Sequence, residues 1–94
     1  MEDCIFCSII KGDIPAEILY EDDRVLAFKD VNAQAPEHFL VIPKEHISTA
    51  NDATDEALMG RLSITAANIA KEHKFSENGY RLVMNCNSDG GQTV

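Results

Sequence analysis

A stripe of residues at helical spacing between positions 58 and 73 constrains the fold most strongly. Its members are Leu58, Leu62, Thr65, Ala66, Ile69, Ala70 and His73. Residues three and four apart share one face of a helix, so the stripe predicts a long helix packed on a core. We expect Asp52 or Thr54 as its N-cap, with Asp55 and Glu56 in the first turn, where carboxylates complement the helix dipole.

Short apolar runs before and after this helix predict strands. Residues 17–21 and 24–29 flank the turn pair Asp22-Asp23 and indicate a β-hairpin. Residues 38–42 form a near-continuous apolar run that ends at a proline, which is typical of a buried strand. Residues 80–85, which follow Asn-Gly, predict a further strand.

The N-terminal part predicts a short helix from Cys4 to Lys11, closed by Gly12 as a glycine cap. The resulting order is α-β-β-β-α-β with short connections. That order indicates the α+β class with an antiparallel sheet. Ninety-four residues suit one domain, 1–94, and are too few for two.

Charge and composition restrict the partners and the location. The formal net charge of −8 argues against binding to nucleic acid or to an anionic membrane, although a few local donors could still hold a small phosphorylated ligand. No apolar run approaches the roughly 18 residues of a membrane span. The acidic start Met1-Glu2-Asp3 is unlike a signal peptide, so we expect a cytoplasmic protein.

Cysteines at positions 4 and 7 have the spacing of half a zinc site. His46 is a plausible third ligand, and Cys86 is a candidate for the fourth. Two alternatives are a structural or coincidental pair and a redox pair. An odd number of cysteines without a secretory signal disfavours a disulfide framework.

The remaining polar candidates each have a simpler explanation. Asp30 ends a predicted strand, where its carboxylate could accept hydrogen bonds from a ribose diol or could only form a turn. His38 opens a buried strand and could be a core histidine bonded to neighbouring backbone. His73 is expected to be solvated or to complement the dipole of its helix.

Asn85 and the loop 88–94 are the best candidates for anion binding, because Gly90 and Gly91 permit close backbone approach. An ordinary hairpin turn would have the same composition. The apolar residues Phe6, Ile9 and Phe28 are more often core than ligand contacts.

Taken together, these segments resemble the histidine triad (HIT) family, in its branch of small nucleotide-binding phosphoramidases (protein kinase C inhibitor-like). The segments that carry the resemblance are residues 4–16, 20–30, 34–46, 79–85 and 88–94. The resemblance implies a five-stranded antiparallel sheet with a short N-terminal and a long helix, joined in a homodimer into a ten-stranded sheet. It also implies hydrolysis of purine nucleoside 5′-phosphoramidates through a covalent nucleotidyl-histidine.

The resemblance assigns the site residues. Asp30 would bind the ribose hydroxyls, and His38 would lie at the edge of the catalytic centre. Residues around the nucleoside would be Ile5, Phe6, Ile9, Phe28, Val31 and Leu40. Residues on the phosphate and leaving-group side would be Asn85, Gly91, Gln92, Thr93 and Val94. A structural zinc ion would be held by Cys4, Cys7 and His46 with the first histidine of the triad.

The sequence departs from the family in one respect. Its three histidines lie at positions 38, 46 and 73, and no His-x-His occurs. The His-x-His-x-His motif and the last strand of the sheet are expected just past Val94, so we expect a C-terminally truncated domain with no nucleophile, no fourth zinc ligand and no activity of its own. Alternative functions are a zinc- or nucleotide-binding regulatory module without catalysis and a dinucleoside polyphosphate hydrolase of the same family.

Overall fold

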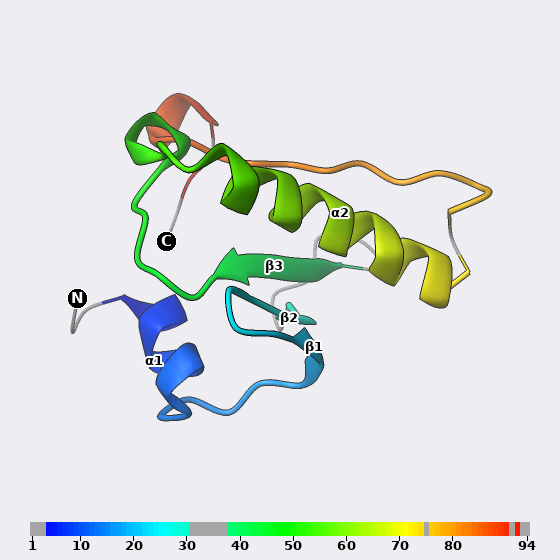
Figure 1. Ribbon diagram of the computed structural model, residues 1–94, viewed down its shortest axis with the longest axis horizontal. Helices are drawn as coiled ribbons and strands as arrows, with labels where there is room; N and C mark the ends of the chain where they lie inside the picture. Colours follow the sequence, from blue (N-terminus) through cyan, green and yellow to red (C-terminus); the bar gives the residue numbers. More distant parts are fainter. Residues whose placement is uncertain (1–3, 31–37, 75, 91, 93–94) are drawn as a thin grey trace.

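The computed structural model describes residues 4–30, 38–74, 76–90 and 92, which form an antiparallel sheet with one helix against each face (Figure 1). The elements are α1 (Ile5–Lys11), β1 (Ile18–Glu21), β2 (Val25–Lys29), β3 (Phe39–Pro43), the 3₁₀ turn η1 (Ala50–Asp52), α2 (Glu56–Glu72) and the 3₁₀ turn η2 (Ser88–Gly90). The predicted α+β class with an antiparallel sheet is confirmed.

The strand β2 lies in the middle of the sheet, in the order β1-β2-β3. Its side chains alternate between two apolar clusters, as strand geometry requires. Val25 packs with Leu58 and Leu62 of α2 on one face. Leu26 and Phe28 face the other way and pack with Ile42, and residues of α1 cover them.

The N-terminal helix and the hairpin form where the sequence predicts them. Cys4 caps α1 by accepting a hydrogen bond from the Cys7 backbone N–H, and Gly12 ends the helix in the left-handed conformation at φ 85°. In the hairpin turn, Asp22 accepts hydrogen bonds from the backbone N–H groups of Arg24 and Val25, at 2.8 and 2.9 Å. A short side chain that bonds its own turn in this way favours the reversal of the chain.

The predicted stripe of α2 faces the core, and its buried residues are Leu58, Leu62, Thr65, Ile69 and Ala70. The predicted N-caps were wrong. Asp52 ends η1, and Thr54 lies between the two elements. Asp55 is the N-cap, because its carboxylate accepts from the Leu58 backbone N–H at 3.0 Å and pairs with the Arg24 guanidinium from the hairpin.

His73 follows the last turn of α2 and is exposed, as predicted. Its ring also lies 4.9 Å from the Phe39 ring, measured between centroids. The end of α2 therefore contacts the first residue of β3.

The predicted strand at residues 80–85 is wrong for this structure. These residues are exposed, and the segment runs beside α2 without joining the sheet (Figure 1). A strand exists through pairing with a neighbour, and within the described part of the chain β3 pairs with β2 alone. The apolar pattern of this segment reflects a preference for extended backbone that finds no partner strand here.

Within the described residues, no helix has both the length and the apolar character that crossing a membrane requires.

Candidate functional site

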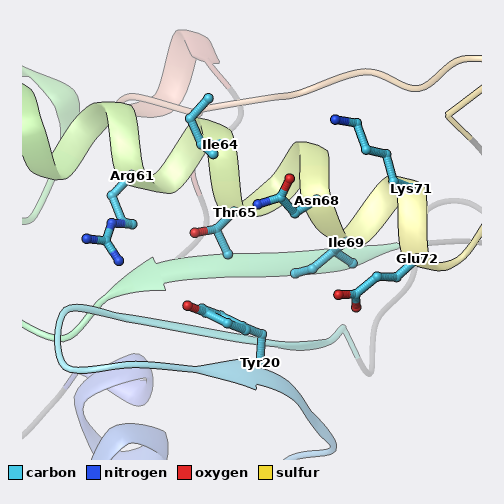
Figure 2. A pocket seen from close by; sticks show the side chains of 8 residues that line it. All are labelled: Tyr20, Arg61, Ile64, Thr65, Asn68, Ile69, Lys71 and Glu72. Atoms are coloured by element: carbon cyan, nitrogen blue, oxygen red, sulfur yellow. The ribbon is translucent and has the colours of Figure 1, made fainter.

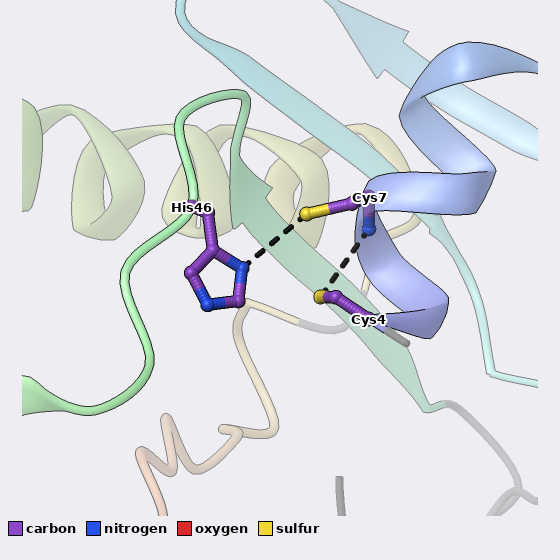
Figure 3. A group of neighbouring side chains, drawn as sticks. All are labelled: Cys4, Cys7 and His46. Carbon is purple, nitrogen blue, oxygen red and sulfur yellow. Dashed lines mark hydrogen bonds between the residues drawn. The ribbon is translucent and has the colours of Figure 1, made fainter. Parts of the chain in front are cut away.

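Two thiols and an imidazole meet where the N-terminus of α1 approaches the segment after β3 (Figure 3). Cys4 and Cys7 lie on α1 and its cap, and His46 comes from the other side. The Cys7 Sγ lies 3.3 Å from the His46 Nδ1, and the Cys7 backbone N–H donates to the Cys4 Sγ at 3.4 Å. One ligand atom of each residue lies within 4.8 Å of the others. The helical cap therefore places both thiols on the side that faces the histidine.

The two thiols differ in acidity. Burial raises the pKa of Cys4, but hydrogen bonds from the backbone N–H and the thiol of Cys7 outweigh it, so the pKa lies below its ordinary value. The pKa of Cys7 is raised, first because its thiol bonds to the Cys4 sulfur and then by burial. Of the two thiols, Cys4 is therefore the more acidic, and the thiolate is the form in which a cysteine binds a metal ion.

This donor set fits a zinc ion. In a tetrahedral site with Zn–S near 2.3 Å and Zn–N near 2.0 Å, ligand atoms lie roughly 3.3 to 3.8 Å apart. Three such ligands are present in the described part of the chain, and Cys86 is not among them. All three cysteines are free thiols.

A second group of predicted residues gathers on the α1 face of the sheet. The Asp30 backbone N–H donates to the His38 carbonyl at 3.1 Å, which continues the register of β2 and β3 by one pair. The Asp30 Oδ2 lies 3.4 Å from the His38 Nε2, and both side chains are mostly buried, at 19% and 28% exposure. Side chains two apart on a strand share a face, so Asp30 is on the face of Phe28, and His38 on that of Leu40.

The apolar part of this face is built around aromatic rings. Phe6 of α1 and Phe28 of β2 have ring centroids 6.3 Å apart at an angle of 54°. Ile9 and Leu40 belong to the same cluster. This cluster therefore lies on the same face of the sheet as the Asp30 carboxylate and the His38 imidazole.

A sequence profile of the HIT domain matches residues 11–94. The chain belongs to the HIT domain family. It is 48% identical to the purine nucleoside phosphoramidase of Escherichia coli (strain K12) over 95 residues, which cover 99% of this chain and 80% of that protein. A HIT family hydrolase from Legionella pneumophila Philadelphia 1 has a similar structure, with a TM-score of 0.94 and 49% identity over 98% of this chain and 84% of that chain. A histidine triad protein from Clostridium difficile gives a TM-score of 0.94 and 47% identity, covering 100% and 84%.

Not all residues that the HIT resemblance assigns come together. Ile5 is 43% exposed and lies outside the apolar cluster. Asn85 is exposed at the end of the 80–85 segment. Four further predictions concern residues outside the described part of the chain, namely Val31, Gly91, Thr93 and Val94.

Gln92 lies against the segment after β3 in this HIT domain. Its side-chain nitrogen donates to the Ser48 carbonyl at 3.0 Å, and the Ser48 hydroxyl lies 3.1 Å from the His46 Nε2. Sequence reasoning missed Ser48. The only signal was a hydroxyl two residues after a candidate metal ligand, and serine is common in such linkers.

A cavity of about 480 Å³ lies between β1 and α2 (Figure 2), away from both candidate sites. It is lined by Tyr20, Arg61, Ile64, Thr65, Asn68, Ile69, Lys71 and Glu72. The Arg61 guanidinium is paired with the Asp22 carboxylate at 2.8 Å. The Arg61 charge is therefore already neutralised, and the predicted ligand-binding residues lie elsewhere. For these two reasons we do not assign this cavity as the ligand-binding site of the HIT domain.

Proposed function

We propose that this HIT domain is the nucleotide-binding part of a purine nucleoside phosphoramidase. The observation that carries the proposal is 48% identity to a protein of that name along 99% of this chain and 80% of the relative. The juxtaposition of Asp30 and His38 with the Phe6 and Phe28 rings supports it. The proposed substrate is a purine nucleoside 5′-phosphate joined to an amine.

In this proposal the α1 face of the sheet binds the nucleoside. Phe6, Phe28 and Leu40 contact the base, because flat apolar groups are stabilised by removal from water. Asp30 accepts hydrogen bonds from the ribose hydroxyls, which an ionised carboxylate can do strongly. His38 lies next to the reacting phosphate, at the edge of the catalytic centre.

The chemical step is hydrolysis of the phosphorus–nitrogen bond through a covalent nucleotidyl-histidine. The 94 residues contain no His-x-His, so the nucleophile belongs to the triad expected just past Val94. Attack on phosphorus without it has no group to form the intermediate. Residues 1–94 supply binding and orientation, and we propose that they form a single HIT domain only together with that last strand.

Hydrolysis of adenosine 5′-phosphoramidate tests the reaction. The expected result is no turnover by residues 1–94 and clear turnover when the chain is extended by a strand carrying His-x-His-x-His. Turnover by the short chain would show that the histidine mechanism is wrong. An extended chain that cleaves dinucleoside polyphosphates and leaves the phosphoramidate intact would favour the other hydrolase of the family.

Binding of adenosine 5′-monophosphate tests the nucleoside face separately from catalysis. Asp30→Ala is expected to weaken binding measured by calorimetry by about ten- to a hundredfold, because it removes charged hydrogen bonds worth roughly 1.5–3 kcal/mol. Asp23→Asn, an exposed carboxylate in the hairpin turn, serves as the control and should leave the affinity unchanged. Equal losses in both variants would indicate a general effect of charge.

We further propose that Cys4, Cys7 and His46 bind a structural zinc ion, since their atoms and chemistry fit one. When bound, the ion would crosslink α1 to the segment after β3. The test is zinc content by mass spectrometry: Cys4→Ser should lower the stoichiometry, whereas Cys86→Ser should not. Unchanged zinc in Cys4→Ser would exclude Cys4 as a ligand.

The proposed assembly is a homodimer in the cytoplasm. Exposed apolar residues support a second copy as the partner, and they are Ile64, Tyr80, Leu82, Val83 and Met84. Net charge of −8 supports a protein that binds neither nucleic acid nor anionic membranes.

The second candidate function is a metal-binding regulatory module without catalysis. The Cys4, Cys7 and His46 group favours it, because that group needs no triad histidine to bring its atoms together. A chain that binds zinc tightly, and that stays without phosphoramidase activity after extension by the triad strand, would support this candidate over the enzyme.

A further inference from the structure

Hydrogen bonds connect the candidate metal ligands to the turn formed by residues 87–90, here called the Asn87 turn. The His46 Nε2 lies 3.1 Å from the Ser48 hydroxyl. The Ser48 carbonyl accepts from the Gln92 side-chain nitrogen at 3.0 Å. The Gln92 side-chain oxygen accepts from the Asn87 backbone N–H at 2.6 Å. Both ends of the Gln92 amide are therefore used, one on the turn and one on Ser48.

Metal-ligand chemistry decides which atom donates in the hydrogen bond between the His46 Nε2 and the Ser48 hydroxyl. The His46 Nδ1 faces the Cys7 sulfur at 3.3 Å, so this nitrogen is the one that would bind a metal (Figure 3). A ligating nitrogen uses its lone pair, which places the proton of the neutral ring on Nε2. The Nε2–H then donates to the Ser48 hydroxyl. Such a bond fixes both the tautomer and the orientation of a ligating histidine.

The Asn87 turn depends on Gln92 for its shape. Asn87 has a left-handed backbone at φ 58°, which costs a residue with a side chain some conformational energy. Its carbonyl accepts from the backbone N–H groups of Gly90 and Gln92, at 3.2 and 3.0 Å. Because Gln92 also bonds the Asn87 N–H, the bond from Gln92 to Ser48 ties the whole turn to the segment after β3.

We propose that Ser48 is a positioning residue that couples metal binding at Cys4, Cys7 and His46 to the order of the Asn87 turn. Its hydroxyl orients the metal ligand and its carbonyl holds the turn. This inference rests on the metal site proposed above and adds a link from that site to the turn. By thermodynamic linkage, a metal that orders the turn is itself bound more tightly when the turn is ordered.

Solvent exposure of His46 and Ser48 determines how much metal affinity is lost when the bond between them is removed. His46 and Ser48 are both exposed, so water competes for the bonds between them. Loss of a partner that orients a metal ligand typically weakens metal binding about 10- to 100-fold. The exposed geometry places the expected loss at the lower end of that range.

The experiment compares zinc affinity, measured by competition with a chromophoric chelator, among variants of the full 94-residue chain. Ser48→Ala should weaken zinc binding about tenfold, and Ser48→Thr, which keeps the hydroxyl, should restore most of it. Ser63→Ala is the matched control, because the Ser63 hydroxyl donates to the Met59 carbonyl within its own helix, α2. It should bind zinc as the unaltered chain does.

Amide hydrogen exchange then reports on the turn without any assay of activity. Zinc should slow exchange at the N–H groups of Asn87 and Gly90 in the unaltered chain and in Ser63→Ala. Ser48→Ala should lose this slowing because its metal ligand is no longer fixed. Gln92→Glu should lose it as well, because a carboxylate can still accept from Asn87 but cannot donate to the Ser48 carbonyl.

Zinc that binds equally well to Ser48→Ala, or exchange at Asn87 and Gly90 that is the same with and without zinc, would overturn the coupling and leave the metal site standing. Zinc binding that is unaffected by Cys4→Ser, Cys7→Ser and His46→Ala would overturn both the site and the coupling. Restoration by Ser48→Thr separates a lost hydroxyl from a misfolded chain.

Discussion

Asp22 is the residue whose carboxylate does most to hold the hairpin in place. One oxygen accepts from two backbone N–H groups of the turn, and the other accepts from the Tyr20 hydroxyl and the Arg61 guanidinium, each at 2.8 Å. The hydrogen bond from the Arg24 backbone N–H is the first cause that lowers the pKa of Asp22 below its ordinary value of 3.8. Because Arg61 lies on α2, this one carboxylate joins the turn to the long helix.

The lowered pKa predicts a loss of stability in acid. The unfolded chain binds a proton at Asp22 more readily than the folded chain, so this stabilisation is complete above about pH 4 and is lost as the pH falls through the folded pKa. Asp22→Asn should lower the free energy of unfolding and flatten its decrease as the pH falls from about 4 to about 2, measured by urea denaturation. Asp13→Asn, at an exposed site outside the turn, should keep the slope of the unaltered chain. A slope in Asp22→Asn equal to that of the unaltered chain would contradict the prediction.

At the scale of elements, only one face of α2 packs against the sheet. Leu58 is 1% exposed and contacts the cluster of Val25 and Leu62, whereas Ile64 on the opposite side is 62% exposed. Figure 2 shows Ile64 directed away from β3. Two apolar residues of similar size on one helix therefore have very different surroundings.

Truncation of each residue should reveal the difference. Leu58→Ala removes a fully buried side chain and should lower the free energy of unfolding by about 2–5 kcal/mol, through lost burial and a residual cavity. Ile64→Ala should change it by no more than about 0.5 kcal/mol in the monomer. Urea denaturation at low protein concentration measures both. Similar losses in the two variants would mean that the outer face of α2 is covered in solution.

Sequence patterns predicted those elements whose determinants are local. The Asp22-Asp23 turn, the Gly12 cap and the stripe from Leu58 to Ala70 each depend on neighbours in the chain. The N-cap of α2 was missed because several capping residues compete, and Arg24 from the distant hairpin favours Asp55. The 80–85 segment was mistaken for a paired strand because composition reports a preference for extended backbone and cannot supply a partner.

In the candidate site, too, local features could be predicted from the sequence and long-range contacts could not. The spacing of Cys4 and Cys7 is local and predicted a metal half-site with His46 as third ligand, and the structure brings these three side chains into a group that could hold a metal ion. The Ser48 contacts with His46 and Gln92 cross the fold, and the pair Ser48–Gln92 spans 44 positions. Only a folded chain could reveal that connection.

At the scale of the whole molecule, apolar side chains remain on the surface around α2 and the 80–85 segment. Leu82, Val83 and Met84 are each more than half exposed. Exposed apolar side chains that lie together on a small protein commonly mark an interface. The net charge of −8 makes copies of the chain repel one another, so we expect self-association to use these apolar residues.

Leu82→Asp is expected to weaken self-association, because it introduces a charge into surface that a second copy would bury. Light scattering coupled to size-exclusion chromatography over a range of concentrations measures the effect. Asn78→Asp adds the same charge at an exposed polar position and should leave the mass distribution unchanged. A monomer at all concentrations before substitution would refute the homodimer.

The central strand β2 gives the molecule its least replaceable segment. Val25 to Phe28 are at most 4% exposed, with Val25 in one apolar cluster and Leu26 and Phe28 in the other. In a library that samples every substitution and selects for folded protein, most strands should show an alternating pattern of depletion. In β2 the depletion should be continuous over four positions, because side chains on both faces of this strand are buried, one face toward α2 and the other toward α1.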